Sequence, residues 1–159
     1  MNKNQDRNQS DNKIRSSIIG WRETIALPQL GIEKIKAKID TGARSAALHA
    51  FHIQQLEQGN RKIIRFQVHP FQRDHQTTIT TEAELLEYRQ VRNSGGMAQL
   101  RPVILTEIEL GEQRWSIELT LTNRDVMGFR MLLGRQAVRH QFLVDPGKSF
   151  IQSCHHQEE

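Results

Sequence analysis

The sequence predicts an all-β domain with one short helix near its C-terminal end. Apolar and polar residues alternate with a period of two in segment after segment, as in strands that bury one face. Residues typical of tight turns, mainly Gly, Pro, Asn and Asp, separate these segments. With 159 residues, of which 36% are hydrophobic and 25% charged, the chain suits one compact domain with a modest core.

The two ends of the chain differ in composition from its centre. Residues 1–15 contain almost no apolar side chain, so burial cannot offset the entropy of ordering, and we expect a disordered polar arm. The domain is expected over residues 16–153, and a polar tail over residues 154–159. No apolar stretch is long enough for a membrane span and no secretory signal is present, which predicts a cytoplasmic protein without a membrane partner.

The first half of the chain predicts a hairpin followed by further strands. Residues 18–27 and 32–39 form the expected hairpin, joined by a turn that contains Pro28 and Gly31. The further strands expected in this half are residues 46–53, residues 64–68 and a Thr-rich stretch from 77 that continues to 91. The composition of residues 82–89 also suits a short helix, and that alternative stays open.

The second half predicts a long hairpin, a half-buried strand and a terminal hairpin. Residues 93–96 form the tip of the long hairpin, and residues 103–110 its second strand. In the next strand Trp115, Ile117, Leu119 and Leu121 share the core face, while the alternate residues meet solvent or a partner. A short buried strand over 131–133 breaks at Gly134, and residues 136–140 suit a helix. Residues 142–144 and 150–151 flank the turn 145–148 as a terminal hairpin.

The most informative motif is Asp40-Thr41-Gly42-Ala43, directly after the predicted strand 32–39. A carboxylate at a strand end, followed by a hydroxyl and by a glycine that permits a sharp turn, delivers an acid to the floor of a cleft. An ordinary turn capped by Asp40 is the alternative, because Asp-Thr-Gly arises often by chance. In a regular strand Asp40 would point to the polar face, so the turn must re-aim it.

Two distant segments together resemble the paired signature of retropepsins, the half-size aspartic proteases that work as homodimers. One is the Asp40 motif and the other is Leu132-Leu133-Gly134-Arg135. Longer stretches over 20–23, 36–44, 121–124 and 131–135 resemble more closely a bacterial retropepsin-like family often labelled an ATP-dependent zinc protease. The resemblance covers roughly residues 18–151. It implies a closed acid-protease barrel with one short C-terminal helix.

The resemblance also implies an aspartic-type endopeptidase that works through one Asp40 from each subunit of a homodimer. Two carboxylates about 3 Å apart share a proton, so that one acts as base on a water and the other as acid toward the peptide carbonyl. Because the motif occurs once, the second carboxylate must come from a symmetry mate. Asp125 and Asp145 lie in comparable loops, but neither is followed by Thr-Gly or Ser-Gly.

Further site residues follow from the same resemblance. Thr41 is expected to brace the two active-site loops across the two-fold axis, and Gly134 to lie beneath the catalytic turn. The residues expected to support the active-site loop are Thr41, Gly42, Ala43, Leu133, Gly134 and Arg135.

Substrate contacts are expected at Arg44 and at the glycine tip of the long hairpin. Where viral retropepsins usually have acidic residues after the motif, this chain has Arg44, a cation that would favour an acidic peptide. An Arg44 paired within its own fold is the alternative. Gly95 and Gly96 suit the tip of a moving flap, with residues 69–75 as a competing loop. The family context, a role alongside an ATP-dependent glutamate ligase, suggests a glutamate-rich peptide as substrate.

The residues do not support the zinc or ATP of the family label. No His-Glu-x-x-His motif is present, and His49 and His52 would point to opposite faces of a strand. Gly147-Lys148-Ser149 resembles the end of a phosphate loop but lacks its first glycine. We therefore expect no metal and no cofactor.

The remaining functional alternatives are non-enzymatic. A net charge of +4 is modest, and its spread along the chain argues against a nucleic-acid partner. A non-catalytic retropepsin-fold binding module and a basic protein that docks on ribosome or RNA both stay open. The expected partners are a peptide or protein substrate and a second copy of the chain.

Overall fold

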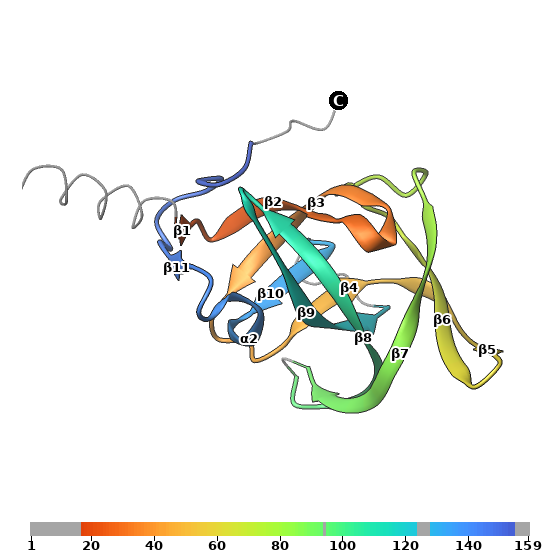
Figure 1. Ribbon diagram of the computed structural model, residues 1–159. Helices are drawn as coiled ribbons and strands as arrows, with labels where there is room; N and C mark the ends of the chain where they lie inside the picture. Colours follow the sequence, from red (N-terminus) through yellow and green to blue (C-terminus); the bar gives the residue numbers. More distant parts are fainter. Residues whose placement is uncertain (1–16, 94, 124–127, 155–159) are drawn as a thin grey trace, which may run out of the picture.

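The computed structural model describes residues 17–93, 95–123 and 128–154 (Figure 1). The expectations for the arm at 1–15, for residues 155–159 of the tail and for Asp125 lie outside these residues. The strands are β1 (Ile18–Ile19), β2 (Arg22–Leu27), β3 (Ile32–Asp40), β4 (Ala46–His49), β5 (Phe51–Gln58), β6 (Arg61–Val68), β7 (Ile79–Arg92), β8 (Ala98–Leu110), β9 (Gln113–Thr122), β10 (Met131–Gly134) and β11 (Leu143–Val144). A 3-10 helix η1 (Pro28–Leu30) and the helix α2 (Arg135–Val138) complete the described elements.

Six strands form a closed ring in the order β2-β3-β10-β4-β9-β8, which Ala26 of β2 closes by pairing with Glu109 of β8. Strands β10 and β3 are parallel, as are β4 and β9, and the other neighbours in the ring are antiparallel. From β8 the sheet continues through β7 and β6 to β5 as an extension. The predicted all-β closed barrel with one short helix, α2, is confirmed. Closure leaves the strands around the site without free edges.

The core lies inside the ring and follows the period-two pattern of the sequence. Alternate residues of β3 and β9 point inward, including Ile35, Ala37, Leu119 and Leu121. The opposite face of β9 differs from its expectation. Thr120 is buried there, because strands flank it on both sides and its hydroxyl donates to the Ala46 carbonyl instead of to water.

The terminal hairpin was a wrong prediction. β11 pairs in parallel with β1, and the chain from 145 to 154, here called the C-terminal strap, runs along β2 instead. The Trp21 amide donates to the Lys148 carbonyl (2.8 Å), and the Phe150 amide donates to the Arg22 carbonyl (3.0 Å). The predicted turn at Asp145 is present. Alternation predicted the apolar character of these residues, but pairing depends on which distant edge is open.

A buried carboxylate fixes the strap to the barrel. Glu23 is fully buried, and its two oxygens accept the amides of Ile151 (2.9 Å) and Gln152 (2.6 Å). The side chain of Ser153 accepts the Thr24 amide (2.7 Å). These bonds satisfy the carboxylate that burial would otherwise destabilise.

Two other expected segments are divided or assigned differently in the structure. The predicted strand 46–53 splits at Ala50 into β4 of the ring and β5 of the extension, with a bulge and a left-handed His52 (φ 49°) after it. The helical alternative for residues 82–89 is wrong, because they lie in β7 and pair with β6 and β8. Tertiary pairing decides the conformation of a segment whose composition allows both.

Candidate active site

The Asp40 motif forms a tight turn at the end of β3. Asp40 Oδ1 accepts hydrogen bonds from the amides of Gly42 (3.0 Å) and Ala43 (3.3 Å). Its other oxygen, Oδ2, has no hydrogen-bond partner among the described residues, and the side chain is half-buried. Thr41 and Gly42 are exposed beside it. One carboxylate oxygen is thus held by the turn, and the other is available for chemistry.

The end of β10 and the start of α2 support this turn. Gly134 is the register partner of Asp40, so the two motifs that carry the family resemblance, at Asp40 and at Gly134, lie on neighbouring strands. The amides of Arg135 and Gln136 donate to the carbonyls of Ala43 (2.9 Å) and Arg44 (3.1 Å), which satisfies groups that a helix start leaves free. Arg135 Nη1 also donates to the Gly42 carbonyl (3.3 Å).

Gly134 has no space for a side chain. A Cβ built there would lie 2.5 Å from the Ser45 carbonyl oxygen and 2.8 Å from the Ser45 amide nitrogen. The backbones of β10 and of the chain after the Asp40 turn are therefore in direct contact. Leu133, one residue earlier, is fully buried in the core. Four of the residues expected to support the active-site loop make such contacts. The amides of Gly42 and Ala43 bond to Asp40, Gly134 is paired with Asp40, and Arg135 bonds to the Gly42 carbonyl.

A transverse row of residues crosses the outer face of the ring next to Asp40. Its members are register partners on successive strands: Arg22, Lys38, Leu132, Ala47, Thr120 and Val103. Two cations stand at one end, and the buried members Leu132, Ala47 and Val103 lie toward the other. Lys38 precedes Asp40 by two residues on β3. Sequence reasoning assigned no role to Arg22, although it lies in a stretch, 20–23, that carried the family resemblance.

Arg44 is exposed directly after the motif. Its backbone carbonyl accepts the Gln136 amide, but its guanidinium has no partner among the described residues. The alternative in which Arg44 pairs with its own fold therefore finds no partner in this part of the chain. The role of Arg44 toward a substrate stays a prediction.

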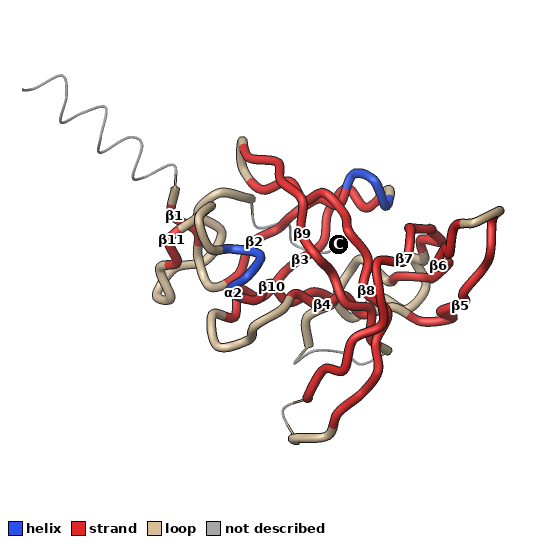
Figure 2. Tube along the Cα trace, turned by 60° about the horizontal axis from the view of Figure 1, so that its bottom comes forward, coloured by secondary structure: helices blue, strands red, loops and turns tan. Residues whose placement is uncertain are grey.

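The glycine tip joins β7 to β8. Hydrogen bonds within the tip close it: the Asn93 amide donates to the Met97 carbonyl, and the Met97 amide donates to Asn93 Oδ1, both at 3.0 Å. In Figures 1 and 2 the tip projects from the same side of the ring as the loop between β3 and β4. The competing loop contacts the opposite end of β10, where Phe71 accepts a hydrogen bond from Arg130. This placement favours Gly95 and Gly96 as the flap, which stays a prediction.

The residues considered for metal and nucleotide have other contacts. His52 Nδ1 lies 2.7 Å from Gln67 Oε1, and His49 packs near the ring of Phe51. Lys148 lies in the strap, where its carbonyl accepts the Trp21 amide. Within the described ranges no group of three or more His, Cys, Asp or Glu side chains could hold a metal ion. In the same ranges no helix has the length and apolar character needed to cross a membrane.

A closed six-stranded ring with an Asp-Thr-Gly turn, supported from beneath by Gly134 and Arg135, defines a retropepsin-like fold. The chain belongs to the RimB-like family, described as retropepsin-like aspartic endopeptidase RimB, whose model matches residues 18–155. The suspected family is thus confirmed.

Curated relatives and a solved structure resemble the chain over most of its length. A probable alpha-L-glutamate ligase of Parasynechococcus marenigrum is 48% identical over 132 residues, which are 83% of this chain and 28% of that protein. A protein of the same description from Shewanella pealeana is 43% identical over 141 residues, 89% of this chain and 30% of that protein. The chain therefore spans less than a third of these relatives. The crystal structure of the Legionella pneumophila protein Lpg0085, of unknown function, matches with a TM-score of 0.69 and 32% identity, covering 84% of this chain and 96% of that one.

Proposed function

We propose that the protein is an aspartic-type peptidase whose catalytic pair consists of one Asp40 from each subunit of a homodimer. The observation that carries the proposal is the Asp40 turn. Backbone amides hold Oδ1, whereas Oδ2 has no partner among the described residues. A carboxylate held in this way by backbone amides has a fixed orientation and keeps one oxygen available for proton transfer, as a general base or acid requires.

The chemistry needs two such carboxylates. When two Asp40 side chains meet across a two-fold axis, they share one proton and titrate as a pair. The ionised carboxylate takes a proton from a water, which attacks the peptide carbonyl carbon, and the protonated carboxyl donates its proton to the carbonyl oxygen. Thr41 and Gly42 are exposed beside Asp40, so the turn is open to a second copy.

A glutamate-rich peptide is the proposed substrate. The relatives that contain a domain like this one are named as probable glutamate ligases, so the domain occurs in proteins named for joining glutamate. A peptidase in that setting would act on the product of the ligase. Arg44, whose guanidinium has no partner among the described residues, would favour acidic side chains near the scissile bond, as would Lys36 and Lys38 on β3.

The substitution Asp40→Asn tests the peptidase. It keeps the size of the side chain and removes the charge, so cleavage of a glutamate-rich peptide should fall by roughly 10³-fold. Asp145→Asn is a matched control, because Asp145 Oδ1 also accepts the amide two residues on, from Gly147 at 3.0 Å. Its activity should stay near that of the unmodified protein. Equal activity of the Asp40→Asn protein would leave a non-catalytic binding module as the better description.

The homodimer has a separate test. Adding an excess of the Asp40→Asn protein to the unmodified protein should lower activity, because mixed pairs hold only one competent carboxylate. The mass in solution, measured at micromolar concentration, should include a dimer. Activity that is unchanged by the Asp40→Asn protein would contradict a pair shared between subunits. Strong, salt-dependent RNA binding that does not require Asp40 would instead support docking on RNA.

A further inference from the structure

The C-terminal strap holds one arginine of β2 in a fixed position. The Cζ atom of Arg22 lies 4.7 Å from the ring centroid of Trp21 and 5.1 Å from that of Phe150. Its Nε donates a hydrogen bond to Ser149 Oγ (3.1 Å). Aromatic stacking and this bond fix the plane of the guanidinium, which lowers the entropy lost when a ligand binds.

The two terminal nitrogens of the Arg22 guanidinium have no hydrogen-bond or ion-pair partner in the part of the chain that the structure describes. The neighbouring acid, Glu23, is fully buried and uses its oxygens on the amides of the strap. A half-buried arginine whose two Nη atoms have no partner among the described residues suits bidentate binding of a carboxylate.

Two lysines of β3 extend the positive charge. Lys38 is the register partner of Arg22, and Lys36 is the partner of Thr24, so both neighbour Arg22 across the β2–β3 ribbon. Lys36 Nζ lies 5.9 Å from the Phe150 ring centroid, so the same aromatic side chain contacts both cations. Arg22, Lys36 and Lys38 therefore form a cationic cluster, to which β2, β3 and the strap all contribute.

The position of the cluster relates it to the active site. Lys38 precedes Asp40 by two residues, a separation of about 7 Å along a strand. Alternate side chains of an extended peptide repeat at the same distance. A peptide that presents its scissile bond to Asp40 can therefore place a carboxylate two or more residues away over this cluster.

We infer that Arg22, aided by Lys36 and Lys38, forms a carboxylate-binding subsite that selects acidic substrates next to the Asp40 turn. The inference rests on the proposed peptidase function. The carboxylate belongs either to an acidic side chain or to the C-terminus of the peptide, since both present the same two oxygens.

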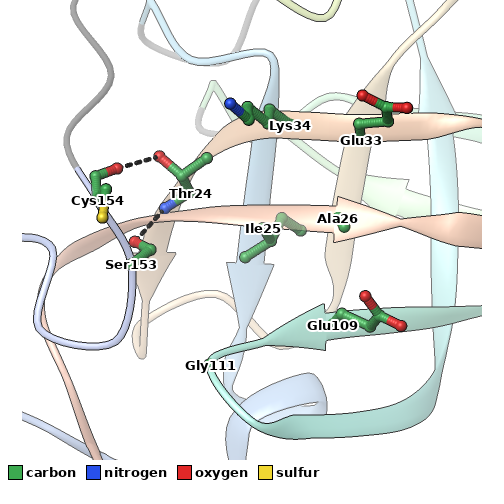
Figure 3. A pocket seen from close by; sticks show the side chains of 9 residues that line it. All are labelled: Thr24, Ile25, Ala26, Glu33, Lys34, Glu109, Gly111, Ser153 and Cys154. Atoms are coloured by element: carbon green, nitrogen blue, oxygen red, sulfur yellow. Dashed lines mark hydrogen bonds between the residues drawn. The ribbon is translucent and has the colours of Figure 1, made fainter.

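A shallow pocket at the other end of the strap provides a contrast. Figure 3 shows that Ser153 and Cys154 of the strap contact Thr24 there, and that Glu33 and Glu109 line it with Lys34. Two carboxylates against one ammonium disfavour an anion. Lys34 lies on the same strand as Lys36 and Lys38 and carries the same charge, so it is a matched control for the subsite.

The test measures binding in the absence of cleavage. In the Asp40→Asn protein, the affinity for a fluorescent tetraglutamate peptide is compared with that for tetraglutamine. Arg22→Gln should weaken tetraglutamate binding by roughly 10-fold or more. Arg22→Lys, which keeps the charge and loses the fork, should recover part of it. Lys34→Gln should change it by less than about 2-fold.

Further variants keep the test decisive. If Arg22→Gln does not fold, Phe150→Leu replaces it, because this change removes the stacking partner and keeps every charge; it should weaken binding several-fold. An amidated peptide distinguishes the two sources of the carboxylate, and a loss on amidation assigns the C-terminus. The subsite is overturned if Arg22→Gln, or Phe150→Leu in its place, has no larger effect than Lys34→Gln, or if amidated tetraglutamine, which lacks both kinds of carboxylate, binds as well as tetraglutamate. Because cleavage is not measured, failure of the subsite and failure of the peptidase remain distinguishable.

Discussion

The Asp40 turn and the tip of the β7–β8 hairpin are both glycine-containing loops, but they are held in different ways. Backbone groups of β10 and α2 hold the Asp40 turn, through the amides of Arg135 and Gln136 and the close contact at Gly134. The tip is closed by Asn93, whose backbone and side chain bond to residues of the tip itself. The first loop is part of the barrel, whereas the second can change without disturbing it.

The difference matches two requirements of the proposed peptidase. A catalytic carboxylate must keep its position to a fraction of an ångström, whereas a loop that admits substrate must move. The same contrast recurs elsewhere. Buried Glu23 ties the C-terminal strap to the barrel, while Asp74 closes its turn through residues only two and three positions away.

The largest effect is expected at Gly134. Gly134→Ala would place a Cβ 2.5 Å from a backbone oxygen, and neither backbone can move without shifting the ring. We expect a loss of about 3 kcal/mol in the free energy of unfolding, measured by urea denaturation, with the loss of any peptidase activity. Gly95→Ala at the tip is the control, since its Cβ would meet a side-chain oxygen 3.3 Å away. Equal losses for both variants would break the distinction between the two loops.

Glu23 tests whether the strap is held by the fold in the same way. Glu23→Gln keeps the shape but replaces one accepting oxygen with a donor that faces a backbone amide. A buried group left unsatisfied costs about 1–3 kcal/mol, so the free energy of unfolding should fall by that amount. Hydrogen exchange at Ile151 and Gln152 should accelerate. Unchanged exchange would mean that other contacts of the strap suffice.

Sequence reasoning predicted the parts of the molecule that depend on local pattern and on the paired motif. Alternation predicted the inward faces of β3 and β9, and the resemblance paired Asp40 with Gly134. It did not predict the strap, because Phe150 and Ile151 are as apolar as strand residues and their amides reach distant groups on β2. It missed Arg22 for the same reason. One of the two aromatic rings beside Arg22, that of Phe150, is 128 positions away, and only the folded chain brings the two together.

The smallest effect is expected at the turn that Asp74 closes. Its carboxylate accepts the Thr77 hydroxyl and the amides of Gln76 and Thr77, which lower its pKa from 3.8 to about 2. A lowered pKa means that the contribution to stability is complete above pH 3.8 and is lost as the pH falls through about 2. Asp74→Asn removes this contribution at pH 7, and we expect only a slight fall in the midpoint of global unfolding, because the turn is exposed and these bonds reach no further than three residues along the chain.

The titration of Asp74 also has a specific control. An NMR titration should place the midpoint of Asp74 near pH 2. Thr77→Val removes the hydroxyl that donates to Asp74 and keeps the two backbone amides, so it should raise this midpoint part of the way toward 3.8. A midpoint that does not move would assign the lowered pKa to the backbone amides alone. A fall in global unfolding on Asp74→Asn as large as that of Glu23→Gln would instead place this turn with the Asp40 turn, among loops that the barrel holds.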